Sequence, residues 1–188
     1  TTSLAIASPA AAGTNVQTYT FNQSTAQKWT LLETEKTLYS IMGKTNVSVS
    51  QMVKFYKNKA TVSYPYSNVS EAPTIEKFCQ IYKEESEVEG VKAEVAFAQA
   101  MMETGFLKFG GDVKKDQYNF AGIGAIGGGS SGAKFDSIRI GIRAHVQHLK
   151  AYASKEALKQ PVVDPRFQYV KRGSAEYVQW LGQKENPN

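Results

Sequence analysis

Hydrophobic residues along most of the chain recur at intervals of three or four positions. That interval places them on one face of an α-helix, whereas a half-buried strand alternates apolar and polar residues. The stretches with helical spacing are 24–43, 48–59, 73–89, 91–104 and 137–153, with a short one beginning at 174. No long alternating stretch occurs in the sequence. The pattern therefore predicts a mainly α fold with one hydrophobic core.

Local signals set the ends of these helices. Ser48 followed by Gln51 matches a capping box, in which each side chain accepts a hydrogen bond from the other residue's backbone N–H. Gly105 is expected to end the fourth helix in the left-handed conformation. Asp136 or Ser137 is expected to cap the helix that ends near residue 153.

Two stretches depart from the helical pattern. Residues 122–132 are rich in glycine and predict a small lobe, in which a short β-hairpin is one possible arrangement. Residues 1–20 are rich in Ala, Ser and Thr but have no basic start, so they predict a flexible tail or linker rather than an intact signal peptide. Residues 21–188 are expected to form a single domain.

Composition narrows the class of protein. The 188 residues carry a net charge of +5, which suits an anionic partner, but the basic residues are scattered and no nucleic-acid module is recognisable. No apolar run is long enough to span a membrane. Cys79 is the only cysteine, which excludes an intramolecular disulfide, and its helical stripe predicts a buried position. A solvated helix face is expected for the acidic run Glu84, Glu85, Glu87 and Glu89.

The sequence contains partial matches to nucleotide-binding and metal-binding motifs, but the residues around them do not fit either kind of site. Gly122 to Gly127 has the spacing G-x-G-x-x-G, but more glycine follows instead of a helix. The phosphate-binding loop pattern fails as well, because Lys134 is not followed by Ser or Thr. His145 and His148 are too few to bind a metal and are expected to be exposed or at the edge of the core. No metal or cofactor is therefore expected.

Glu103 is the strongest catalytic candidate. The apolar face predicted for its helix consists of Val91, Val95, Ala98 and Met102. Glu103 falls in the last turn, where the helix dipole favours cations, and Gln99 and Ala100 precede it on its own side. Such surroundings favour the protonated carboxyl that a general acid needs. A solvated glutamate at a helix end explains this stretch equally well.

An aromatic and amide patch follows about fifteen residues later. Tyr118, Asn119 and Phe120 combine rings, which stack on the apolar faces of sugars, with an amide that can pair with an acetamido group. The alternative interpretation is a turn in which Phe120 fills the core.

Together these motifs resemble the glucosaminidase domains of bacterial autolysins, glycoside hydrolase family 73, and within it the clostridial branch. The resemblance covers about residues 41–187 and rests on Glu-Thr-Gly at 103–105 followed by Asn-Phe-Ala-Gly-Ile at 119–123. Further matching stretches are 89–91, 98–102, 109–113, 141–145, 148–152 and 164–167.

The resemblance implies a lysozyme-like α fold with a groove. It also implies hydrolysis of the β-1,4 bond between N-acetylglucosamine and N-acetylmuramic acid in peptidoglycan, with Glu103 as the general acid. The substrate contacts that it implies are Gln99, Tyr118, Asn119, Phe120, Gly122, Ile123 and Tyr152. The expected protein is a secreted monomer of the cell wall, whose partners are glycan strands and, through its positive charge, anionic wall polymers.

The sequence departs from the family in one respect. Many members carry a second glutamate beyond the Asn-Phe motif, whereas here the first carboxylate is Asp136, a candidate base or nucleophile that is also a candidate helix cap. Inverting, retaining and substrate-assisted mechanisms all stay open, and the lack of a second glutamate favours the third. A lytic transglycosylase and a non-catalytic wall-binding module are the alternative functions.

Overall fold

The computed structural model describes residues 2–7, 16–21, 38–129 and 131–181. The chain divides into two units, Thr1–Tyr39 and Ser40–Asn188. In the first unit, strands β1 (Thr2–Ala7) and β2 (Val16–Phe21) pair in antiparallel register, with Thr2 opposite Phe21. These strands were not predicted from the sequence. The division into a tail of residues 1–20 and a domain of residues 21–188 stays a prediction.

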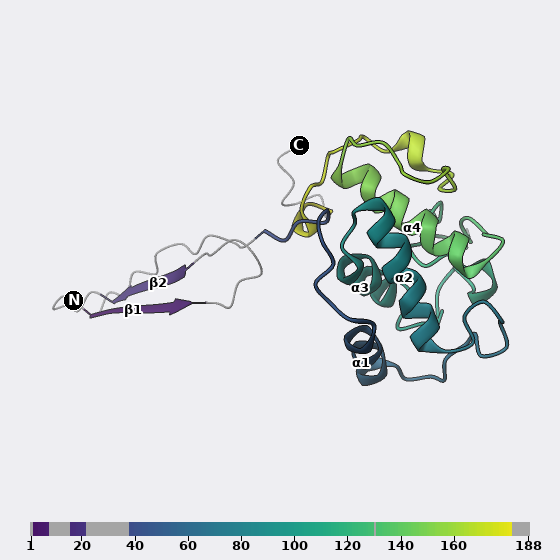
Figure 1. Ribbon diagram of the computed structural model, residues 1–188, viewed down its shortest axis with the longest axis horizontal. Helices are drawn as coiled ribbons and strands as arrows, with labels where there is room; N and C mark the ends of the chain where they lie inside the picture. The colour runs from purple at the N-terminus through teal and green to yellow at the C-terminus, as the bar shows by residue number, and fades with distance from the viewer. Residues whose placement is uncertain (1, 8–15, 22–37, 130, 182–188) are drawn as a thin grey trace. The chain divides into compact units, whose positions relative to one another are not determined.

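The described part of the second unit contains four α-helices (Figure 1). They are α1 (Val49–Lys59), α2 (Ile75–Glu89), α3 (Ala93–Glu103) and α4 (Ile138–Ala153). Short 3-10 helices are η1 (Lys115–Gln117), η2 (Phe167–Tyr169) and η3 (Val178–Trp180). Helix α2 packs against each of the other α-helices, and α4 lies along it. The predicted mainly α, lysozyme-like fold is confirmed.

Aromatic side chains fill the centre of this unit. Phe78 lies with its ring centroid 5.2 Å from that of Phe120 and 5.4 Å from that of Tyr82, and all three rings are fully buried. The first pair is edge-to-face and the second is tilted, and aromatic pairs at such distances add to the free energy gained by burying the rings. Cys79 is buried among them, as predicted, and burial raises the pKa of its thiol to about 12. The thiol is therefore protonated and unreactive at neutral pH.

The helix ends follow the local signals. The Ser48 hydroxyl accepts from the Gln51 N–H at 3.1 Å, and the Gln51 side chain accepts from the Ser48 N–H at 2.8 Å, which confirms the capping box. Gly105 adopts the predicted left-handed conformation with φ of +58°. Ser137 caps α4 by accepting from the Ile140 N–H at 3.2 Å, so Asp136 is not the cap.

Two predicted helices differ from the structure in the residues that can be compared: the first one, and the one expected to begin at 174, where residues 174–181 contain only the 3-10 helix η3. Residues 24–37 of the first predicted helix lie outside the described residues, and 38–43 are not helical, since Met42 forms a β-bridge with Val91. In the glycine-rich stretch, residues 122–129 and 131–132 are turns and loop apart from an isolated bridge residue at Gly127, so the hairpin considered as one arrangement of this lobe is not formed by them.

The acidic run on α2 was predicted to be a solvated face, but this was wrong, because two of its carboxylates are buried against α4. Glu85 accepts from Arg139 at 3.0 Å and from Arg143 at 2.9 Å. Burial raises the pKa of Glu85, but the hydrogen bonds from Arg143, Gln160 and Arg139 outweigh it, so that the net pKa is lowered. Glu89 pairs with Lys150 at 3.0 Å, and both side chains are completely buried. These pairs fasten α4 to α2.

The close approach of α4 to the loop before the glycine-rich lobe requires glycine at position 141. A Cβ there would overlap the backbone carbonyl of Tyr118, a residue that is itself in the left-handed region with φ of +50°. We expect Gly141→Ala to lower the free energy of unfolding by about 1–3 kcal/mol through overpacking. In an unhindered helix the same change raises stability by about 1 kcal/mol. Urea unfolding measures the sign, and a stabilised variant would contradict the close contact.

Candidate active site

Helix α3 buries only part of the predicted apolar face: Val95 is 8% exposed, as predicted, but residues outside that face are buried as well. Phe97 and Met101 are 2% and 0% exposed, whereas Met102 from the predicted apolar face is 77% exposed. Val91 is buried but precedes the helix. The bulkier Phe97 and Met101 take the core side, because burying them removes more apolar surface from water than burying Ala98. On the Glu103 side of the helix, Ala96 and Ala100 are buried and Gln99 is half-buried, whereas Glu103 at the helix end is exposed.

Glu103 is the last residue of α3, in the final turn as predicted, and its side chain is exposed. The next residue fixes the chain reversal that follows. The Thr104 hydroxyl donates to the Ala100 carbonyl at 2.7 Å and accepts from the Leu107 N–H at 3.0 Å. Three non-glycine residues of this reversal have positive φ: Phe106, Leu107 and Phe109. Such strain is concentrated at functional sites.

Glu103 lines a cavity of about 210 Å³ beyond this reversal. Its other lining residues are Thr104, Phe109, Gly110, Gly111, Asp112, Val113, Asn119, Gly122 and Ala125. Glu103 and Asp112 are the two lining residues with ionisable side chains. Asp136 is exposed and does not line this cavity, so the second carboxylate chosen from the sequence is not brought to Glu103. Asp112 was not chosen from the sequence, although it lies in the stretch 109–113 that carries part of the family resemblance.

Asn119 holds the wall of the cavity together. Its side-chain oxygen accepts from the Ile123 N–H at 2.9 Å, and its amide nitrogen donates to the carbonyls of Ile123 at 2.9 Å and Ala133 at 3.1 Å. Both N–H groups are therefore used within the loop. Gln117, which the sequence analysis did not single out, donates to the Ser131 carbonyl at 2.6 Å and to the Ala133 carbonyl at 3.3 Å. The two amides tie the glycine-rich lobe to the preceding segment.

The other residues predicted around Asn119 occupy different environments. Phe120 is 0% exposed, so its ring lies in the core and offers no face to a sugar. Ile123 is buried in a small apolar cluster with Phe135, against which Tyr118 packs half-buried. Gly122 lines the cavity. The alternative interpretation of this patch, a turn in which Phe120 fills the core, describes its ring correctly.

A second cavity, of about 300 Å³, contains the remaining predicted contacts, Gln99 and Tyr152. Gln99 lies one helical turn, or about 6 Å, before Glu103 on the same side of α3. Ala121 lines this cavity and the adjoining Gly122 lines the first. We infer that the two cavities are neighbouring parts of one groove along α3.

The two histidines of α4 lie beside this second cavity. His148 lines it, and its Nδ1 lies 2.8 Å from the buried carboxylate of Asp164. His145 is 0% exposed, so the expectation of an exposed or core-edge position was wrong for it. Within the described residues, no group of three or more His, Cys, Asp or Glu side chains is arranged to hold a metal ion.

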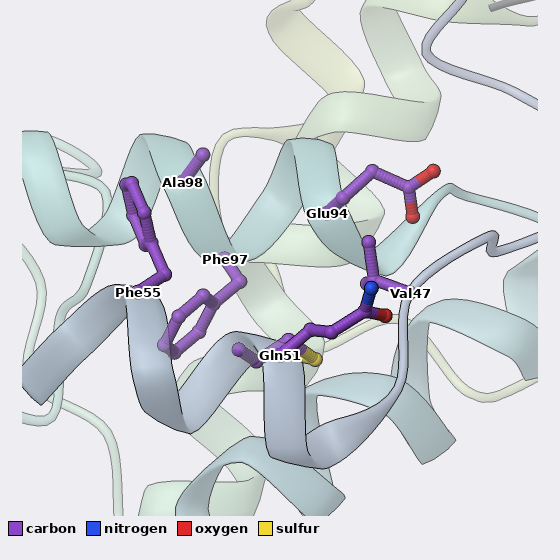
Figure 2. Close-up of a pocket in the computed structure, with 7 residues that line it drawn as sticks. Val47, Gln51, Phe55, Glu94, Phe97 and Ala98 are labelled. Atoms are coloured by element: carbon purple, nitrogen blue, oxygen red, sulfur yellow. The ribbon is translucent and has the colours of Figure 1, made fainter.

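A third cavity, of about 260 Å³, lies between α1 and α3. Figure 2 shows Phe55 and Gln51 of α1 facing it together with Phe97 and Ala98 of α3. Its lining is largely apolar and contains one carboxylate, that of Glu94. Positions 94, 97 and 98 point away from position 103 around the helix, so this cavity is separate from the groove.

One comparison with known proteins identifies the class of domain. The model of the Glucosaminidase family, described as mannosyl-glycoprotein endo-beta-N-acetylglucosaminidase, matches residues 79–186, more than half of the chain. A Borreliella burgdorferi protein named "Uncharacterized protein" is 55% identical over 94 residues, which are 50% of this chain and 46% of the relative. The chain thus spans about half the length of the curated relative that it matches. No solved structure matches it. No helix among the described residues is both long and apolar enough to cross a membrane.

Proposed function

Because this chain belongs to the glucosaminidase family, we propose that it is an endo-β-N-acetylglucosaminidase acting on bacterial peptidoglycan. The bond cleaved is the β-1,4 linkage between N-acetylglucosamine and N-acetylmuramic acid. The observation that carries this proposal is the exposed carboxyl of Glu103 at the end of α3, lining a cavity within the matched region.

Glu103 is the general acid in this proposal. It donates its proton to the glycosidic oxygen as the bond breaks, so that the leaving sugar departs as a neutral alcohol. The strained reversal after Thr104 places the second carboxylate, Asp112, in the same cavity.

Asp112 replaces Asp136 as the proposed second carboxylate. It either activates a water molecule or accepts a hydrogen bond from the 2-acetamido N–H of the substrate, and both roles require a charged acceptor in the cavity. We expect Asp112→Asn to lower the rate of reducing-end release by about 100-fold. Asp136→Asn is the matched control and should keep the parent rate, because this exposed side chain lies outside the cavity. If Asp136→Asn lowered the rate and Asp112→Asn did not, Asp136 would be the second carboxylate instead.

The site of action proposed is the cell wall outside the cell, where the chain acts as a secreted monomer. Its net charge of +5 supports adsorption to anionic wall polymers. Added salt should weaken that adsorption by screening.

Purified peptidoglycan provides the test. We expect the chain to clear an insoluble suspension and to release reducing ends in proportion to enzyme concentration. A protein that sediments with the wall but releases no soluble fragments would be a wall-binding module, and the proposed hydrolysis would be wrong.

A further inference from the structure

A chain of buried hydrogen bonds leads from the core to the second cavity of the groove. The Tyr82 hydroxyl lies 3.0 Å from Nδ1 of His145, and Nε2 of His145 lies 2.8 Å from the side-chain oxygen of Gln99. Tyr82 and His145 are 0% exposed, whereas Gln99 lines the cavity. The three residues come from α2, α4 and α3.

The protonation of this chain follows from burial. Burial, with a smaller contribution from the neighbouring His148, lowers the pKa of His145 to about 3, so the ring is neutral at pH 7. Burial also raises the pKa of Tyr82 well above its ordinary value, so the hydroxyl keeps its proton. A neutral imidazole has one N–H donor and one acceptor nitrogen.

These roles can be assigned in one consistent direction. The Gln99 oxygen can only accept, so His145 donates from Nε2 and accepts at Nδ1 from the Tyr82 hydroxyl. With the amide reversed, His145 would donate to Tyr82, and the buried hydroxyl hydrogen would need another acceptor. Among the described residues the hydroxyl has no hydrogen bond other than the one to His145. The direction therefore runs from Tyr82 through His145 to Gln99.

This direction decides what Gln99 offers to the cavity. Its carbonyl oxygen is turned toward His145, so the amide nitrogen on the other branch of the planar group is left for the groove. That nitrogen donates to no acceptor in the described part of the chain. The rings of Tyr152 and Trp180 line the same cavity and can contact the apolar face of a sugar.

We propose that His145, anchored by Tyr82, is a positioning residue that holds the N–H groups of Gln99 toward this cavity, where they select the acetamido carbonyl of an N-acetylated sugar. The inference rests on the proposed function and names the side-chain amide of Gln99 as the group that recognises the substrate of that reaction. Asn119, the other amide predicted to bind the sugar, has both of its N–H groups occupied by the loop. A rotating Gln99 would present oxygen and nitrogen alternately, whereas an acetamido carbonyl needs a donor.

The test is a binding titration in the full chain carrying Glu103→Gln, which prevents turnover. The probes are the tetramer of N-acetylglucosamine and cellotetraose, which are both uncharged and differ at C2. The variant is Tyr82→Phe with His145→Phe, because replacing both partners of a buried hydrogen bond by apolar groups of similar shape leaves neither one unpaired. We expect the preference for the N-acetylated tetramer to fall about tenfold, the value of one good hydrogen bond.

His145→Gln in the same background is the conservative variant. Its amide N–H can replace Nε2–H as donor to Gln99, so part of the preference should return. In ¹⁵N spectra of the parent, His145 should carry its proton on Nε2. An unchanged preference in the folded double variant, or a proton on Nδ1 in the parent, would overturn the positioning role. Equal affinity of the parent for the two tetramers would overturn the acetamido subsite, whereas hydrolysis of peptidoglycan by the unmodified chain tests the proposed function separately.

Discussion

Replacement of Glu103 by Gln is expected to lower the rate of reducing-end release from peptidoglycan by about 10³- to 10⁴-fold, near the upper end for loss of a general acid. The amide has nearly the same shape as the carboxyl but has no acidic proton to give to the leaving oxygen. The exposed position of Glu103 at the end of α3 makes a folding defect unexpected. Thermal unfolding should therefore be unchanged while the rate falls.

Glu87→Gln is the matched control for that experiment. Glu87 is an exposed carboxylate on α2, where it forms a surface ion pair with Lys83 at 3.4 Å, and it lines none of the three cavities. The control should keep the parent rate, because Glu87 lies outside the cavities. It should also keep the parent's stability to within about 1 kcal/mol, because surface pairs of this kind contribute about 0–1 kcal/mol. If the Glu103→Gln variant also kept the parent rate of reducing-end release, Glu103 would be a solvated helix-end glutamate.

The second large effect concerns stability. Lys150→Met leaves Glu89 buried without its cation, so we expect the free energy of unfolding to fall by about 3–5 kcal/mol. Lys57→Met is the matched control, because Lys57 forms an ion pair of the same length, 3.0 Å, with Glu76 but has a side chain that is 60% exposed. That control should change stability by at most about 1 kcal/mol.

A double variant separates loss of the pair from loss of packing. Glu89→Gln combined with Lys150→Met removes both charges but keeps an acceptor for the backbone N–H of Lys159. We expect it to recover part of the stability lost in the single variant, because no buried charge is left uncompensated. Urea unfolding of the four proteins measures this. Equal losses in Lys150→Met and Lys57→Met would show that Lys150 is not buried.

Features encoded over a few residues could be predicted from the sequence. The Ser48 and Gln51 cap, the left-handed Gly105 and the place of Glu103 in the last turn each depend on neighbours within about one helical turn. The resemblance to a family then supplied a role for Glu103 that its surroundings alone left undecided.

Features that depend on distant partners could not be predicted. Glu85 lies 54 positions from Arg139, and Glu89 lies 61 positions from Lys150, so an acidic run had no visible reason to be buried. Asp112 reaches the cavity through a reversal in which bulky residues have positive φ, a conformation that the sequence does not signal. Asn119 lines the cavity, but its hydrogen bond to the Ala133 carbonyl uses an amide N–H that the sequence analysis had assigned to the sugar.

Mass analysis of the soluble fragments released from purified peptidoglycan tests the central claim most directly. Hydrolysis after N-acetylglucosamine predicts fragments that end in reducing N-acetylglucosamine and disappear in the Glu103→Gln variant. Fragments that end in an anhydromuramoyl group would instead identify a lytic transglycosylase and contradict the proposed reaction.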